Sequence, residues 1–170
     1  LPCPFFTSTV LSGMAILDLG SESQKQELLP NIASGQIIVT FAATEPETGY
    51  NPDKVKTKAI ADGTNYLISG TKILVPYAHV AQYFICTAKT SGGITLFLAE
   101  NNSPDSKLTP LQTIAADKQF EVVFNKVKVP RENIIGKEGK GQILLHPIML
   151  KSAVAQCAEM VGGAQQVLEM

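Results

Sequence analysis

The side chains that most often carry out catalysis are few and widely separated in this chain. The two histidines, His79 and His146, have no serine or cysteine nucleophile at a recognisable motif spacing, and no nucleotide-binding glycine motif is present. The three cysteines, Cys3, Cys86 and Cys157, form no Cys-x-x-Cys or Cys/His pattern of a metal site. We therefore interpret the histidines as structural or surface residues, expect the cysteines to be buried reduced thiols, and assign no catalytic or metal-binding residue among them.

Charged residues that lie close together offer a second kind of site. Lys54, Lys56 and Lys58 alternate with smaller residues and could meet a phosphate group. The same spacing is typical of a half-exposed strand whose lysines face water and protect a sheet edge, and we favour that interpretation. Glu45 and Glu47 are also close in sequence, and we interpret them as solvated carboxylates of a turn.

One stretch, FAATEPETGYNP at residues 41–52, combines features of a cofactor site. Thr44 follows an apolar run, so its hydroxyl and backbone can present hydrogen-bonding groups at a strand end. Pro46 stiffens the corner that follows, and Gly49 permits a left-handed turn whose exposed N–H groups can hold a phosphate oxygen. The stretch predicts a surface against which a cofactor lies, with an ordinary surface turn as the alternative.

The composition limits the classes of partner. Of 170 residues, 17% are charged, against a typical value of about 25%, so we expect another domain or subunit to cover part of the surface. The net charge of −1 and the 6% aromatic content without tryptophan argue against nucleic-acid binding. No apolar run approaches the length of a membrane span. We interpret the chain, which begins with Leu1, as a fragment of a longer protein.

The elements that must position these residues fall into three groups. Residues 5–18 are apolar nearly all round and predict a buried helix, and Ser21 begins a capping box for a second helix over 22–29. That helix should stop at Pro30, and Gly35 should end the following turn in a left-handed conformation.

Short β-rich runs separated by turn signals follow, and no helical interludes occur between them. We expect a hairpin turn at Ser69-Gly70 and further turns at 62–63 and 92–93. This spacing predicts an antiparallel sandwich or barrel of roughly 90 to 100 residues. The expected strands are 37–43, 54–60, 65–69, 72–75, 83–88, 94–100 and 120–129.

Residues 142–170 have helical composition and predict one further helix. Pro147 should interrupt or kink its first turns. An apolar stripe follows the helical period, and its partners are expected outside this chain. The stripe consists of Ile148, Val154, Cys157, Val161, Ala164 and Leu168.

Seven short motifs, in order and over nearly the whole chain, make it resemble the acyl-CoA dehydrogenase flavoprotein family. They are GSESQK (20–25), LPNIASG (29–35), TEP (44–46) with Gly49, KVKTKA (54–59), YLISGTK (66–72), EVVF (121–124) with VKVP (127–130), and EGKG (138–141). The resemblance implies an α+β fragment in which a β-barrel or sandwich middle domain is flanked by helices. Residues 1–36 would end an N-terminal helical domain, 37–136 would form the middle domain, and 137–170 would be a linker and the first helix of a C-terminal bundle.

The resemblance also implies a reaction and its partners. A carboxylate removes the α proton of an acyl-CoA thioester while the β hydride passes to N5 of FAD, and an electron-transfer flavoprotein then takes the electrons. Family members commonly form homodimers or homotetramers. The expected compartment is the cytoplasm of a bacterium or the mitochondrial matrix of a eukaryote. An alternative is a non-catalytic relative that keeps the fold as a binding or structural subunit, or a flavin oxidase on the same scaffold.

The resemblance assigns site residues one by one. The expected flavin-binding residues are Phe41, Ala43, Thr44, Gly49, Tyr50, Leu74, Val75 and Pro76. The expected substrate-binding residues are Tyr50, Met149, Ser152 and Ala153. The catalytic base is not assigned, because in most of the family it lies beyond the position of Met170. In a minority it matches Ser152, which cannot act as that carboxylate.

Several positions depart from the family pattern. Tyr50-Asn51 stands where Ser-Asp is usual, and Pro76 replaces a hydroxyl residue that hydrogen-bonds the flavin. Residues 113–117 replace a Gly-x-Arg-Gly-Ser motif, and Leu150 and Ala153 replace an acidic residue and an arginine. These changes turn a polar lining apolar, which motivates the alternative of an altered or lost substrate.

Overall fold

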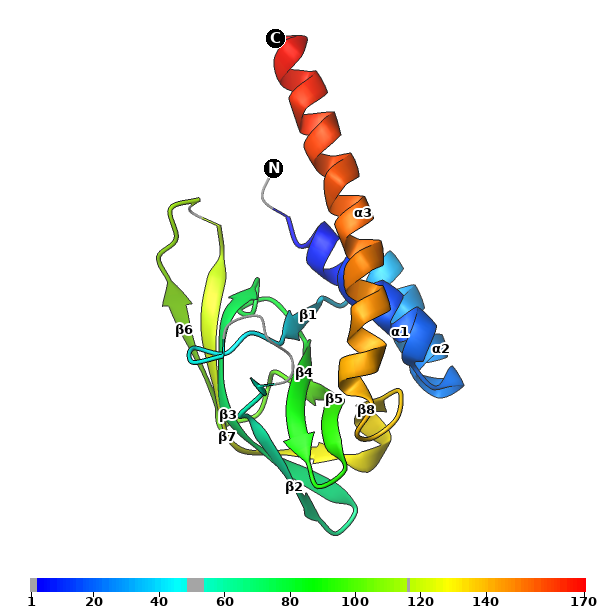
Figure 1. The fold of residues 1–170 in the computed structure, drawn as a ribbon, viewed down its shortest axis with the longest axis vertical. Coiled ribbons are helices and arrows are strands. Elements are labelled where there is room, and N and C mark those ends of the chain that lie inside the picture. The colour runs from blue at the N-terminus through cyan, green and yellow to red at the C-terminus, as the bar shows by residue number, and fades with distance from the viewer. Residues whose placement is uncertain (1–2, 49–53, 116) are drawn as a thin grey trace.

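The computed structural model describes residues 3–48, 54–115 and 117–170. In these residues helices precede a β-rich body, and one long helix follows it (Figure 1). The helical elements are η1 (Phe6–Ser12), α1 (Gly13–Leu19), α2 (Glu22–Ala33), η3 (Arg131–Asn133) and α3 (Gly141–Leu168). The strands are β1 (Val39–Ala42), β2 (Lys58–Asp62), β3 (Asn65–Pro76), β4 (Tyr83–Thr90), β5 (Gly93–Glu100), β6 (Ser106–Leu111), β7 (Gln119–Pro130) and β8 (Ile134–Ile135).

Helix α2 begins as its sequence predicts but ends later. The Gln24 N–H donates to the Ser21 hydroxyl (3.2 Å) and the Ser21 N–H donates to the Gln24 side chain (2.9 Å), which confirms the capping box. The expected stop at Pro30 is wrong, because the helix continues past it and buries Ile32 in the core. This burial offsets the hydrogen bond that a proline removes. Gly35 adopts the predicted left-handed conformation, with φ 73°.

The strands of the described residues form one mixed sheet. Its order is β6-β7-β3-β2-β4-β5-β8, and β1 adds to β4. Most pairings are antiparallel, as predicted, but β1 and β2 each pair with β4 in parallel. The sheet curls without closing into a barrel (Figure 1). The predicted class, an α+β fragment with a β-rich middle part flanked by helices, is confirmed, and the sheet is an open one.

The curled sheet takes part in two apolar cores. The inner core lies between strands of the sheet itself, where Phe84 packs edge-on against Phe124 with ring centroids 5.9 Å apart. The helix-side core lies between the sheet and the helices and includes Ile16 of α1. Strand β1 contributes to both cores, since Phe41 belongs to the helix-side core and Ala42 to the inner core. The end of β1 is therefore held from two sides.

The lysine-rich segment 54–60 has the alternating burial that its sequence predicts. Its lysines are exposed, whereas Val55, Thr57 and Ala59 are buried. The regular strand β2 begins only at Lys58, so the first half of the segment lies outside the sheet ladder. The interpretation of these lysines as a solvated face agrees with their exposure.

The hairpin predicted at Ser69-Gly70 is wrong. Strand β3 continues through this position, and Gly70 lies inside it with φ 156°. A Cβ atom added here would lie 2.7 Å from the Cα of Thr57. The glycine therefore permits a close approach of two chain segments rather than a chain reversal.

Helix α3 passes through Pro147 without the predicted interruption. A proline leaves the carbonyl four residues earlier, that of Ile143, without its helical partner. Both residues are exposed, so water can bind that carbonyl. Beyond Ser152 no side chain of the helix is buried, and Val154 and Val161 of the predicted stripe are exposed. Within the described ranges no helix is both long and apolar enough to cross a membrane.

Candidate functional site

Two chain segments that the resemblance assigns to the flavin meet at one place in the sheet. The Thr40 hydroxyl on β1 donates to the Pro76 carbonyl at the end of β3 (2.7 Å), across 36 residues of sequence. The Ile73 N–H donates to the Thr44 carbonyl (2.9 Å). Residues 43–44 therefore lie beside residues 73–76. We refer to Ala43, Thr44, Leu74 and Pro76 as the shelf.

The predicted flavin-binding residues differ in exposure. Phe41 and Val75 are buried, one in each core. Ala43 and Thr44 are half-buried, and Leu74 has 39% of its surface exposed. In the part of the chain that the structure describes, the Thr44 hydroxyl has no hydrogen-bond partner. A ligand can thus reach the shelf residues, while the Phe41 and Val75 side chains are packed into the two cores.

The backbone of the shelf is strained. Leu74 has φ 54° and Tyr77 has φ 53°, a left-handed conformation that residues other than glycine seldom adopt. The pairing of β3 with β7 also shifts register between Lys72 and Val75. Such irregularities re-aim side chains and gather at functional sites. Here they turn the partly exposed Leu74 out of the regular ladder.

Pro76 offers no hydrogen-bond donor at the shelf. Proline has no N–H and no side-chain hydroxyl, and its carbonyl already accepts the Thr40 hydroxyl. The next N–H, that of Tyr77, donates to the Lys118 carbonyl (2.8 Å). The Tyr77 N–H therefore does not replace the donor that the family resemblance leads us to expect at this position.

Residues 49–53 lie outside the described residues, so the predicted roles of Gly49 and Tyr50 have no structural test. The other divergent segment includes Thr113 and Asp117, and Asp117 lies two residues before Gln119, which pairs with Pro76 across β3 and β7. Thr113 and Gln119 both donate to the Asp117 carboxylate, and these hydrogen bonds hold the pKa of that carboxyl below its usual value. A cavity of ≈ 370 Å³ lies beside this segment, lined by residues 110–113 and 117–120.

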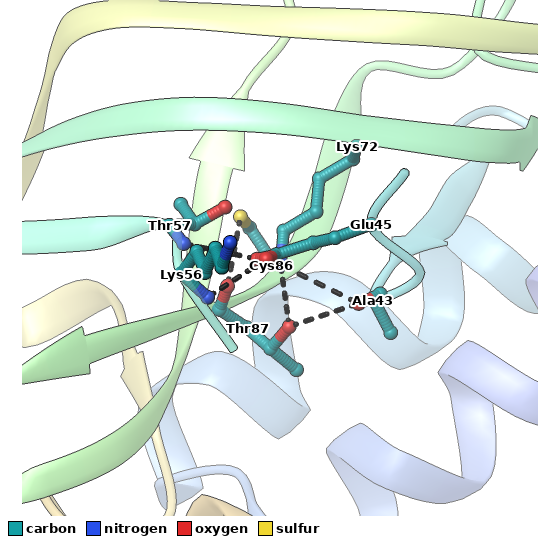
Figure 2. A network of polar contacts seen from close by, with 7 residues as sticks. All are labelled: Ala43, Glu45, Lys56, Thr57, Lys72, Cys86 and Thr87. Carbon is teal, nitrogen blue, oxygen red and sulfur yellow. Dashed lines mark hydrogen bonds and ion pairs between the residues drawn. The ribbon is translucent and has the colours of Figure 1, made fainter. Parts of the chain in front are cut away.

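Beside Ala43 of the shelf lies a buried ion pair that was not predicted from the sequence (Figure 2). Lys72 is fully buried, and its ammonium group lies 2.8 Å from the Glu45 carboxylate. The same ammonium donates to the Thr87 hydroxyl (2.8 Å) and, at 3.4 Å, to the Ala43 carbonyl. The interpretation of Glu45 as a solvated turn carboxylate is therefore wrong, because 3% of the residue is exposed.

The Glu45 carboxylate has further partners. The Lys56 N–H donates to one oxygen (2.7 Å), and the Thr57 N–H donates to the other (3.0 Å). Burial raises the pKa of Glu45, but the hydrogen bond and charge of Lys72, with the backbone donor of Lys56, outweigh burial and leave that pKa below its ordinary value. The carboxylate is therefore charged at neutral pH. By contrast Glu47 is exposed and pairs with Lys56 in water, as predicted for a turn carboxylate.

One signal for this pair was present in the sequence. Lys72 stands within the apolar strand β3, and Glu45 follows the apolar run of β1. Opposite charges embedded in two apolar segments are a sign of a buried pair, because neither charge can be buried alone.

The three predicted substrate residues on α3 do not converge on one point. Met149 and Ala153 are exposed, four residues apart on one face. Ser152 is buried, and its hydroxyl donates to the Ile148 carbonyl of the same helix (2.9 Å). An ion pair between Lys151 and Asp18 of α1 (2.6 Å) fixes the orientation of these turns.

The histidines and cysteines take varied positions. His79 is exposed and stacks on the Phe120 ring, with centroids 4.9 Å apart. Cys86 is buried as expected, and burial raises the pKa of its thiol to about 11. The expectation of buried thiols is wrong for Cys3 and Cys157, which are exposed. In the described residues no cluster of three or more His, Cys, Asp or Glu could hold a metal ion.

Comparisons with known proteins agree with this architecture. The family model described as acyl-CoA dehydrogenase, middle domain, matches residues 40–127. An acyl-CoA dehydrogenase of Bacillus subtilis (strain 168) is 31% identical over 162 residues, which cover 91% of this chain and 43% of that protein.

Solved structures give the same result. The butyryl-CoA dehydrogenase from Megasphaera elsdenii aligns with a TM-score of 0.82 and 28% identity, over 88% of this chain and 41% of that one. A glutaryl-CoA dehydrogenase from Mycobacterium smegmatis, in complex with FADH2, aligns with a TM-score of 0.80 and 28% identity, over 86% of this chain and 39% of that one. The chain thus spans about two fifths of the length of these relatives.

Proposed function

Because this chain belongs to the acyl-CoA dehydrogenase family, we propose that it forms the flavin-facing part of an FAD-dependent enzyme. The enzyme would oxidise an acyl-CoA thioester to the 2,3-enoyl-CoA. The observation that carries this proposal is the meeting of residues 43–44 with residues 73–76 on one partly exposed shelf. Residues 43–44 follow β1 and residues 73–76 end β3. The two segments are far apart in sequence and meet only in the folded chain.

The shelf residues fit one side of a flat aromatic ring system. Such a ring needs apolar surface against its face and hydrogen-bonding groups at its rim. Ala43 and Leu74 supply apolar surface, and the Thr44 hydroxyl, which has no partner among the described residues, supplies a group for the rim. When bound, FAD would supply the hydride acceptor of the reaction. The residues of this chain exclude water from one face of the ring and orient it.

The substrate and partners belong to the same proposal. Met149 and Ala153 are exposed on α3, and we propose them as contacts of the acyl-CoA because the family resemblance assigns them to the substrate. Ser152 is buried and supports that face. No residue of the chain is proposed as the base for the α proton. An electron-transfer flavoprotein as acceptor, a homodimer or homotetramer, and residues 137–170 as the start of a helical bundle rest on the family resemblance.

The visible spectrum of the purified full-length protein tests this function. We expect flavin absorption bands that bleach on anaerobic addition of at least one acyl-CoA from a panel of chain lengths. Bleaching without enoyl-CoA product, analysed by mass spectrometry, would contradict the reaction. A colourless protein that does not bind added FAD would contradict the cofactor.

A non-catalytic relative is the second candidate, and Pro76 is the observation that favours it. The shelf lacks a hydrogen-bond donor at this position. One neutral hydrogen bond is worth about 1 kcal/mol net, or roughly fivefold in affinity. Under the enzyme proposal, Pro76→Thr should tighten FAD binding by about fivefold and shift the flavin reduction potential. If neither the wild type nor Pro76→Thr binds FAD, the result favours the non-catalytic alternative over the enzyme.

A further inference from the structure

The buried ion pair lies next to the shelf, where residues 72 and 73 contact the facing segment 43–45. Lys72 contacts the Ala43 carbonyl and the Glu45 carboxylate, and the following residue, Ile73, donates its N–H to the Thr44 carbonyl. Each residue from 43 to 45 is therefore bonded to residue 72 or 73. Lys72 itself precedes the strained Leu74 by two positions, so the pair connects both halves of the shelf.

Glu45, the acidic member of the pair, also binds a further part of the chain. The Glu45 carboxylate accepts the N–H groups of Lys56 and Thr57, where the chain returns to the sheet before β2. The Thr87 hydroxyl on β4 accepts from Lys72 on the remaining side (Figure 2). Four separate segments thus meet at two charged groups, and each contributes a buried residue, namely Glu45, Thr57, Lys72 or Thr87.

A fully buried ion pair is a poor choice for stability alone. Removing two charges from water costs several kcal/mol per ion, and apolar side chains of similar volume are often as stable or more so. What such a pair can supply is one defined geometry, because its hydrogen bonds are satisfied in a single arrangement. The arrangement that it defines here is that of the shelf.

From these contacts we infer that Lys72 and Glu45 are positioning residues for the flavin. The inference rests on the proposed function. The pair does not touch the ring. It fixes the distance and angle between residues 43–44 and residues 74–76, against which the ring lies. Losing the pair should impair flavin binding beyond what the loss of stability explains.

Three variants of the full-length protein test the inference. Lys72→Met and Glu45→Gln each remove one charge with little change in side-chain volume. Val129→Ala is the matched control, since Val129 is buried and lies near the far end of the β3–β7 pairing, opposite Tyr66. FAD affinity, the flavin absorption maximum and the flavin reduction potential are measured at a temperature at which all proteins are folded by circular dichroism.

We expect both charge variants to bind FAD at least tenfold more weakly and to shift the absorption maximum and the potential. Val129→Ala should change none of these three properties, although it lowers thermal stability. If the charge variants affect FAD only as Val129→Ala does, the pair is merely structural and the inference is overturned. Should they fail to fold, Thr87→Val removes one partner of Lys72, and an unchanged FAD affinity in that variant would overturn the inference too.

A separate measurement distinguishes this inference from the proposed function. In the flavin-free protein, the Ile73 amide should exchange with deuterium at least tenfold faster in Glu45→Gln than in Val129→Ala. If the wild-type protein binds no FAD, the proposed function fails and the flavin role fails with it, whatever the exchange rates. If the wild type binds FAD but the Glu45→Gln shelf exchanges no faster, only the positioning role fails.

Discussion

At the scale of single residues, the burial of the charged Lys72 side chain costs the fold free energy that its partners must offset. Its ammonium group is out of contact with water and depends on Glu45 and Thr87 for partners. The exposed pair of Lys56 and Glu47 has the same chemistry in water. Comparing the two pairs separates the effect of burial from the effect of charge.

Lys72→Met should lower the free energy of unfolding by about 3–5 kcal/mol, because it leaves the Glu45 carboxylate buried without its counter-charge. Lys56→Met breaks only an exposed pair and should change the stability by no more than about 1 kcal/mol. Urea denaturation followed by circular dichroism measures both. Equal stability of the two variants would show that burial of the pair is unimportant.

The lowered pKa of Glu45 makes its contribution depend on pH. Because the folded-state pKa lies below the unfolded value of about 4.3, the stabilisation is fully present above that pH and is lost as the pH falls through the folded pKa. The difference in stability between the wild type and Glu45→Gln should therefore be largest near pH 7 and shrink below about pH 4. Denaturant titrations from pH 7 to pH 3 measure this difference, and a constant difference would contradict a charged Glu45.

The candidate site could be predicted only in part. The shelf residues from Ala43 to Pro76 were assigned by position, because short motifs near them match a family, and each motif is local in sequence. The pairing of Glu45 with Lys72 spans 27 residues and depends on how β1 and β3 lie together. Sequence neighbours alone therefore predicted two solvated carboxylates, which is wrong for Glu45 and right for Glu47.

At the scale of elements, glycine and proline account for most differences between expectation and structure. Period-two burial in segment 54–60 and the capping box of α2 follow from short-range rules and were predicted. Gly70 and Pro30 looked like element ends, but packing against Thr57 and the burial of Ile32 kept each of them inside an element. Strand β6 was not predicted at all, since it contains Pro110 and exposes much of its length.

Gly70→Ala tests the packing explanation for β3. The new methyl group would lie 2.5–2.8 Å from three atoms of Thr57, so we expect a loss of about 3 kcal/mol, typical of severe overpacking. Gly63→Ala is the control, because Gly63 has φ 58° but no atom within 4 Å of an added Cβ. It should cost about 1–2 kcal/mol of backbone strain. If thermal denaturation ranks Gly63→Ala as the more damaging change, the close approach to Thr57 is not what requires glycine.

At the scale of the whole molecule, packing ends partway along α3. Leu145, Ile148 and Ser152 are buried, whereas every later residue of the helix lies at or near the surface. Val154, Val161 and Leu168 are 72%, 69% and 83% exposed, on a helix that extends away from the sheet (Figure 1). An isolated helix gains little stability from its own hydrogen bonds, so its order depends on packing.

In the 170-residue chain, amides of α3 beyond Ser152 should therefore exchange with deuterium at least tenfold faster than those of residues 145–152, measured residue by residue by NMR. Ile148→Ala removes a fully buried side chain and should cost about 2–5 kcal/mol. Val154→Gln should stay within about 0.5 kcal/mol of the wild type, since it changes an exposed position. Slow exchange after Ser152 together with a destabilising Val154→Gln would mean that another surface covers this face of α3, and sedimentation of the chain over a range of concentrations would show whether that surface is a second copy.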